Sequence, residues 1–62
     1  MKVVAEFLPP DALGRFQTWK IEHAEALAAI PDDEVRVDSG RASPGGTFVR
    51  VMVADRHSDA FR

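Results

Sequence analysis

The segment Thr47–Ala54 constrains the fold of this chain more than any other stretch. Its sequence, TFVRVMVA, is rich in β-branched and aromatic residues and follows Pro44-Gly45-Gly46 directly. Such a run, entered through a tight turn, predicts a β-strand. Successive side chains of a strand point to opposite sides, which separates Val49, Val51 and Val53 from Phe48, Arg50 and Met52. Both sides are largely apolar, so we expect this strand at the centre of a sheet.

An amphipathic helix is predicted between Pro10-Asp11 and about Ala29. Proline suits the first helical position, an early carboxylate suits the positive end of the helix dipole, and Pro31 ends the helix. At 3.6 residues per turn, one apolar stripe runs along it, made of Ala12, Phe16, Trp19, His23, Leu27 and Ile30. We therefore expect the helix to cover one face of the sheet, with Phe16 and Trp19 in the core.

Two further strands complete the predicted order. Lys2–Leu8 is apolar and stops at Pro9-Pro10, and Glu34–Asp38 alternates with Val35 and Val37 directed inward. The loop 39–46 joins the last two strands, and 55–62 forms a polar C-terminal tail. The fold class is therefore α+β: strand-helix-strand-strand, with a three-stranded mixed sheet in the order 1-3-2 and one helix on one face.

Size and composition favour association with another chain. We interpret residues 1–62 as one small α+β domain, and a core of this size supplies only roughly 3–5 kcal/mol. The chain has no cysteine, so no disulfide can add stability. A net charge of −2 gives no general attraction toward nucleic acid or anionic lipid. Six Arg against two Lys, with no Asn or Tyr, is typical of a GC-rich, bacterial or phage genome.

The uncovered sheet face is the predicted interaction site. Its expected contact residues are Phe48, Met52, Arg50 and Arg36, with Phe48 and Met52 carrying the main contact. An apolar patch bordered by charges is typical of a partner site. The chain is therefore expected to act as a small interaction or regulatory module, through self-association or by docking on another protein.

Other segments permit weaker hypotheses. The loop could cradle an anion with Arg41, Ser43, Gly45 and Gly46, although it lacks the Lys-Ser/Thr ending of a P-loop. Buried His23 could serve as an acid–base group, but spacing assigns it no partner, and Lys20 is expected to run along the edge of the stripe. Asp55, His57 and Asp59 would share a face of an extended tail, a pattern too weak to predict a metal site.

Two alternative functions remain open. One is an oligomer that binds a small molecule, or a small enzyme, with its pocket between subunits. The other is a nucleic-acid binder that uses Arg36, Arg41 and Arg50 with Phe48. We predict no cofactor, no metal and no membrane partner, and we do not expect strong nucleic-acid binding. The short apolar run at the N-terminus is no signal peptide, so a cytoplasmic location is expected.

Overall fold

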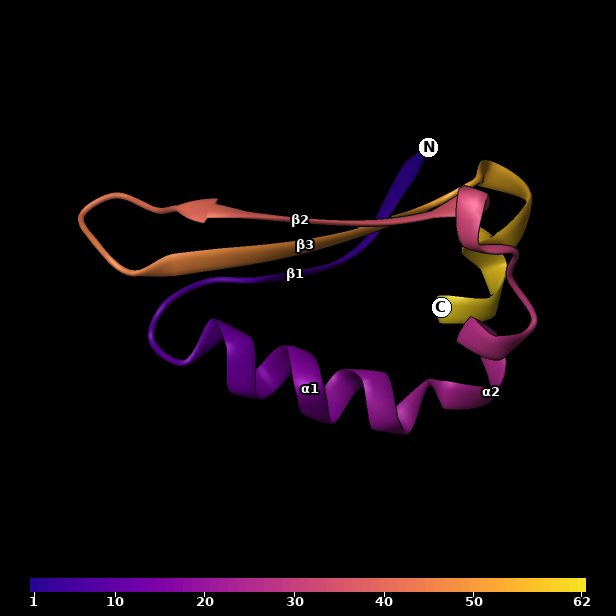
Figure 1. Cartoon of the computed structure of the whole chain (residues 1–62), viewed down its shortest axis with the longest axis horizontal. Helices are drawn as coiled ribbons and strands as arrows, with labels where there is room; N and C mark the ends of the chain where they lie inside the picture. The colour runs from indigo at the N-terminus through magenta and orange to yellow at the C-terminus, as the bar shows by residue number, and fades with distance from the viewer.

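A computed structural model describes all residues 1–62 and shows a sheet with helix α1 packed beneath it (Figure 1). The strands are β1 (Lys2–Phe7), β2 (Val35–Arg41) and β3 (Thr47–Val53). The α-helices are α1 (Ala12–Glu22) and α2 (Ala24–Ala28), and two 3₁₀ helices follow, η1 (Asp32–Glu34) and η2 (Asp55–Phe61). The predicted α+β class and its element order are confirmed.

The sheet has the predicted strand order, β1-β3-β2. Both ladders are antiparallel, with Glu6 opposite Arg50 in one and Asp38 opposite Arg50 in the other. β1 and β2 run in the same direction, but β3 lies between them and they never pair. The sheet is therefore antiparallel throughout rather than mixed.

The core lies between β3 and helix α1. Val49, Val51 and Val53 are each 1% exposed or less, and Ala12 and Phe16 of the helix pack against Val49 and Val51. Phe7 packs on this core from β1, with its ring centroid 6.1 Å from those of both Phe16 and Trp19. The alternation of side chains along β3 therefore separates the residues that lie under the helix from those on the uncovered side of the sheet.

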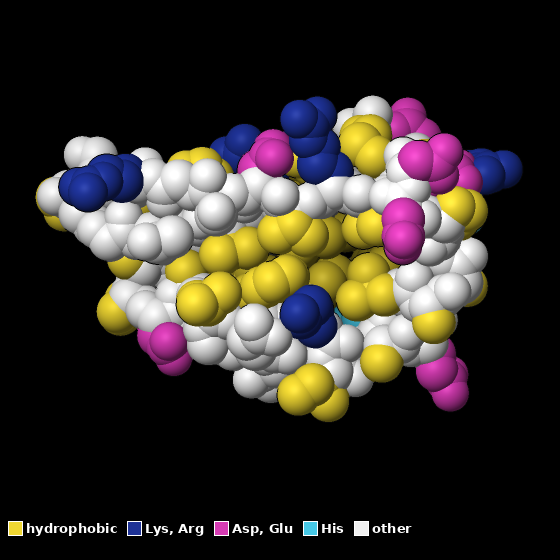
Figure 2. Space-filling view, in the orientation of Figure 1, with side chains coloured by type: hydrophobic (Ala, Val, Ile, Leu, Met, Phe, Trp, Pro, Cys, Tyr) yellow, Lys and Arg dark blue, Asp and Glu magenta, His cyan; other side chains and the backbone are white.

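Helix α1 is offset toward β1 and does not cover β2. It packs on β3 and β1, whereas Val37 of β2 stays 50% exposed although it shares the helix side with Val51. Viewed from the β2 side, apolar side chains form a band between sheet and helix that is open to the viewer (Figure 2). Val37 was predicted to point inward, and it lies on the expected side but beyond the edge of the helix.

The predicted long helix is broken at His23. This residue adopts φ −114° and ψ 24° and separates α1 from α2. The Trp19 carbonyl accepts hydrogen bonds from the His23 backbone N–H at 3.0 Å and pairs with its ring Nδ1 at 2.9 Å. A side chain that shares a backbone acceptor in this way competes with regular helical bonding. The apolar stripe still ends as expected, because Ile30 is buried.

The C-terminal segment is not an extended tail. Residues Asp55–Phe61 form η2, and the C-terminus lies between the end of the sheet and α2 (Figure 1). Phe61 stacks on Trp19, with 5.5 Å between ring centroids and 23° between planes. The prediction of a polar tail missed that this one aromatic residue closes the core.

Strand β1 contains an irregularity that changes which residues face the core. Val3 pairs with Met52, but Ala5 pairs with Val51, so the register shifts at Val4. A bulge places two consecutive residues against one partner position. Val4 and Ala5 consequently both pack toward the core, and Val3 lies on the open face.

The hairpin between β2 and β3 is shorter than predicted. Strand β2 continues through Arg41, so Ser39 to Arg41 belong to the ladder and not to the loop. Gly46 has φ +95°, and a Cβ there would lie 2.8 Å from the side chain of Pro9. This glycine lets the hairpin approach the connection between β1 and α1.

Asp11 caps helix α1 in an uncommon conformation. Its φ of 57° and ψ of 41° are left-handed, and its Oδ1 accepts a hydrogen bond from the Gly14 N–H at 3.2 Å. A Cβ on residue 14 would lie 2.5 Å from both carboxylate oxygens. Gly14 therefore makes room for the cap. The Arg15 guanidinium also donates to the carbonyls of Leu8 and Pro10, which fixes the approach to the helix.

We predict that Val51→Ala destabilises the fold by roughly 1–3 kcal/mol, because it leaves a cavity beneath the helix. In a domain of this size each kcal/mol lowers the Tm by about 4–8 °C. Thermal melts followed by circular dichroism check this, with Val3→Ala as a control at a half-exposed valine of the adjacent strand β1. Equal melting of parent and Val51→Ala would contradict the assigned core.

We predict that Gly14→Ala gives no net stabilisation. Alanine is favoured over glycine inside a helix by about 1 kcal/mol, but its Cβ displaces a capping carboxylate also worth about 1 kcal/mol. In an Asp11→Gly background, which keeps the left-handed backbone and lacks the carboxylate, the same change should raise the Tm. A double-mutant cycle from chemical denaturation measures the difference, and equal effects in both backgrounds would disprove the competition.

Candidate interaction surface

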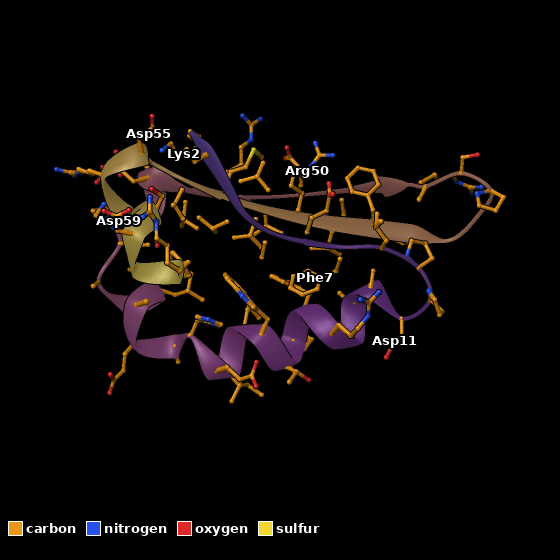
Figure 3. The ribbon with its side chains drawn as sticks, turned by 180° about the vertical axis from the view of Figure 1, so that it is seen from behind. Lys2, Phe7, Asp11, Arg50, Asp55 and Asp59 are labelled. Carbon is orange, nitrogen blue, oxygen red and sulfur yellow. The ribbon has the colours of Figure 1, made fainter.

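The open face of the sheet is built from three rows of side chains that cross its strands. One row joins Val3, Met52 and Arg36, the next joins Glu6, Arg50 and Asp38, and the third joins Phe48 and Gly40. Arg50 stands on the side of the sheet away from α1, whereas Phe7 points between sheet and helix (Figure 3). The four residues predicted to mark this face therefore all lie on it.

Arg50 lies in the middle of this face and contacts both Glu6 and Phe48. Its Nη2 and Nε atoms lie 2.8 Å and 2.9 Å from Oε2 of Glu6. Its guanidinium carbon also lies 5.3 Å from the ring centroid of Phe48, a cation–π distance. Arg36 makes a looser pair with Asp38, with 3.5 Å between Nε and Oδ1. The face thus carries two arginines and two carboxylates, each arginine already paired.

Phe48 is half-buried because it lies across Gly40. A Cβ on residue 40 would come within 2.9 Å of Cε1 of the ring. An aromatic side chain that covers a cross-strand glycine removes apolar surface from water and shields the backbone. Phe48 is consequently more protected than a simple open face predicts, although nothing from another element covers its outer side.

The apolar residues of the open face form two groups separated by charge. Met52 is half-buried beside Val3, which is 53% exposed, while Phe48 lies on the far side of Arg50. Val3 escaped the sequence interpretation because the bulge at Val4 reverses the alternation. A complementary surface would need an apolar group at each end and polar groups in the middle.

The predicted arginine cluster does not converge. Arg36 and Arg50 occupy the open face, but Arg41 pairs with Thr47 and so lies on the helix side of the sheet. Of the other residues proposed for an anion site, Ser43, Gly45 and Gly46 lie exposed in the hairpin loop. The structure therefore separates Arg41 from the other two arginines on which the nucleic-acid hypothesis rested, whereas the residues of the anion hypothesis stay together at the hairpin end of the sheet.

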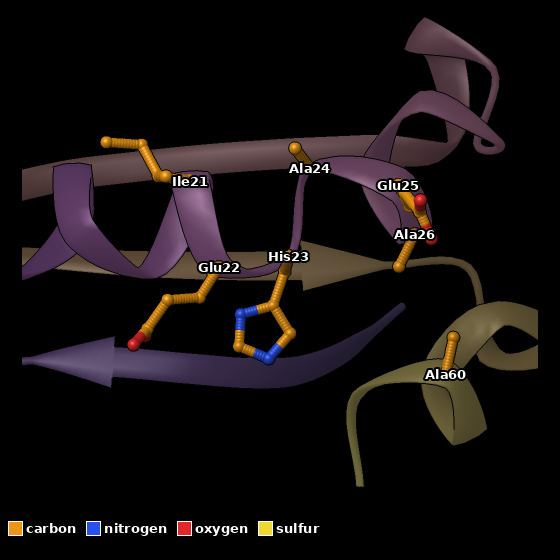
Figure 4. Close-up of a pocket in the computed structure, with 7 residues that line it drawn as sticks. All are labelled: Ile21, Glu22, His23, Ala24, Glu25, Ala26 and Ala60. Atoms are coloured by element: carbon orange, nitrogen blue, oxygen red, sulfur yellow. The ribbon is translucent and has the colours of Figure 1, made fainter.

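His23 borders a shallow cavity of about 460 Å³ at the junction of α1 and α2. Figure 4 shows its ring beside Glu22, with Ala60 of η2 across the opening. The ring stacks on Trp19 at 4.6 Å between centroids, and no hydrogen bond or ion pair joins it to a carboxylate. Its contacts are those of a packing residue. Lys20 also packs, with Nζ 5.1 Å from the Phe16 ring centroid.

The three C-terminal residues considered for a metal do not face one another. Asp59 pairs with Arg62, whereas the Nε2 atom of His57 lies 3.6 Å from Oε1 of Glu34. No group of three potential ligands is placed to hold a metal ion. A 3₁₀ helix, with three residues per turn, does not align alternate residues, which explains the difference from an extended tail.

Glu34 instead anchors η2 to the start of β2. Its two carboxylate oxygens accept bonds from Nε of Arg56 at 2.9 Å and from Nη2 at 2.6 Å. The hydrogen bonds from Arg56 hold the pKa of Glu34 below its ordinary value of 4.5, and the nearby positive charge adds to this effect. The pair ties the C-terminal segment to the sheet.

We predict that acidification weakens this anchor. A carboxyl whose pKa is lower in the folded state stabilises the fold above the unfolded-state pKa, and this contribution is lost as the pH falls through the folded value. Glu34→Gln should therefore show a smaller fall in Tm than the parent between pH 7 and pH values below about 4. The control is Glu25→Gln at an exposed carboxyl without an ion pair; a parent-like fall in Glu34→Gln would exclude this role.

Comparisons with protein-family models, with curated proteins and with solved structures found no match for this chain. No helix combines the length and the apolar character needed to cross a membrane. Function must therefore be argued from the surface itself.

Proposed function

We propose that this protein is a small interaction module that binds a protein partner through the open face of its sheet. The observation that supports this is the absence of a second layer over Val3, Phe48 and Met52. Burying such side chains is worth about 1.5–3 kcal/mol each, relative to full exposure. Because Phe48 and Met52 are half-buried already, the gain from a partner is the part of their surface still open.

The charges between the apolar groups determine which partner fits. Glu6, Arg50, Asp38 and Arg36 alternate in sign, so the face has no net charge. A strongly charged ligand gains little there. A partner with two apolar side chains and a polar centre that bonds to the guanidinium fits better, since charged groups at an interface set orientation more than affinity.

The small core gives a second reason for association. Six of the 62 residues are buried, and all six are apolar. A partner that binds the folded chain and not the unfolded chain stabilises the fold by mass action. Binding at the open face would add the apolar contacts that the single chain lacks.

We predict that a photo-crosslinking residue at Val3 captures a partner protein in cells that express the chain. Val3 is exposed on the open face and leaves Phe48 and Met52 intact. The adduct should disappear in the Phe48→Ser, Met52→Ser double variant, because both apolar groups are then lost. The matched control carries the crosslinker at Ile21, which is 78% exposed on α1.

Two results would reject this proposal. Equal adducts from Val3 and Ile21 would show nonspecific capture. An adduct from Val3 of twice the chain's mass would assign the open face to a second copy instead of a partner protein. Circular dichroism of the double variant confirms that any loss of the adduct does not come from unfolding.

A further inference from the structure

Strand β2 has a free outer edge, and its geometry identifies the backbone groups that point outward. Ala42 donates to the Gly46 carbonyl at 3.1 Å, and the Glu34 carbonyl accepts from Ala54 at 2.9 Å. Even-numbered residues of β2 therefore bond to β3. The N–H and C=O groups of Val35, Val37 and Ser39 point away from β3, and none of them makes a backbone bond outside the ladder.

The two edges of the sheet differ in their capacity to accept another strand. β1 carries the register shift at Val4, and bulges of this kind impair further pairing at an edge. β2 is seven residues long, regular along its whole ladder, and contains neither proline nor lysine. β2 therefore lacks the bulge, the proline and the lysine that often protect an edge strand, and the charged side chains that it does carry are Arg36, Asp38 and Arg41.

We propose that a second copy of this chain pairs with this edge, β2 against β2, in an antiparallel register centred on Val37. A two-fold axis at that point makes the interface self-complementary. Val37 meets its own copy, and Val35 meets Ser39 of the other chain. These pairs provide about six backbone hydrogen bonds from groups that are free in the single chain.

The charges on β2 favour this register over its neighbours. Centred on Val37, Arg36 of each chain lies opposite Asp38 of the other, in the closer, non-hydrogen-bonded type of pair. Centring the register on Arg36 would oppose two arginines, and centring it on Asp38 would oppose two aspartates. Continued outward, the favoured register also brings Arg41 toward Asp33, and neither of these residues has an ion pair within the single chain.

The offset of helix α1 fits the same arrangement. The axis stands perpendicular to the sheet, so both helices lie on one side and both open faces on the other. Val37, half-exposed because the helix stops short of β2, would lie against Val37 of the second copy. The product is one six-stranded sheet. This contact uses the backbone edge of β2, whereas the partner proposed above binds the open face, and the two contacts share the side chains of Arg36 and Asp38.

Charge exchange tests the register directly. Sedimentation analysis of the parent should show a mass about twice the 6.8 kDa of one chain, with concentration dependence. Arg36→Asp and Asp38→Arg should each weaken dimerisation by roughly tenfold, because two attractive pairs become repulsive. The combined Arg36→Asp, Asp38→Arg variant should restore it. Dissociation of the single variants without recovery in the combined variant would overturn the register.

A backbone test does not depend on the charges. Val37→Pro removes an N–H that points outward and should give a monomer, whereas Val37→Thr keeps that N–H and should dimerise. Hydrogen exchange should show the amides of Val35, Val37 and Ser39 protected only at concentrations that give the dimer. A parent that remains monomeric at several hundred micromolar, with these amides unprotected, would disprove the proposal.

The open-face variant separates this inference from the proposed function. Phe48→Ser, Met52→Ser should keep the dimer mass while losing the crosslinked partner. Loss of the dimer in this variant, with the fold intact by circular dichroism, would place the self-contact on the open face and overturn the edge pairing.

Discussion

The packing of the β3 valines against helix α1 is the contact on which the rest of the molecule depends. Val49, Val51 and Val53 supply half of the six buried residues, and no disulfide supports them. The other elements pack around this row of valines. The helix lies over it, Phe7 and Trp19 extend it, and the C-terminal 3₁₀ helix closes its end through Phe61.

The two faces and the two edges of the sheet differ from one another. One face is covered by the helix, and the other has no cover. The β1 edge is interrupted by its bulge, while the β2 edge is regular and lies beyond the reach of the helix. If both proposed contacts form, two open faces lie side by side on one dimer. A partner with two sites would then bind both at once, with the second contact made within the complex.

The sequence predicted those features that follow from local periodicity. The alternation in β3 identified the buried valines and the strand order, and the helical stripe identified Ala12, Phe16 and Ile30. The bulge at Val4 was not predictable, because it depends on how β1 is aligned with β3. The position of Phe61 was not predictable either, since one aromatic residue in a polar segment gives no period, and its partner Trp19 is distant in the chain. The four residues predicted for the candidate surface do lie on the open face of the sheet. The contact of the Phe48 ring with Gly40 and the exposure of Val3 were not predictable, because both depend on the cross-strand register.

The stack of His23, Trp19 and Phe61 also gives the molecule an internal optical reporter. Trp19 is the single tryptophan of the chain, and its indole ring packs against both the imidazole of His23 at the helix break and the phenyl ring of Phe61, which also contact each other. Its emission therefore depends on whether the last residues are docked. A change in that fluorescence at constant helical signal would reveal opening of the C-terminal segment before the rest of the fold is lost.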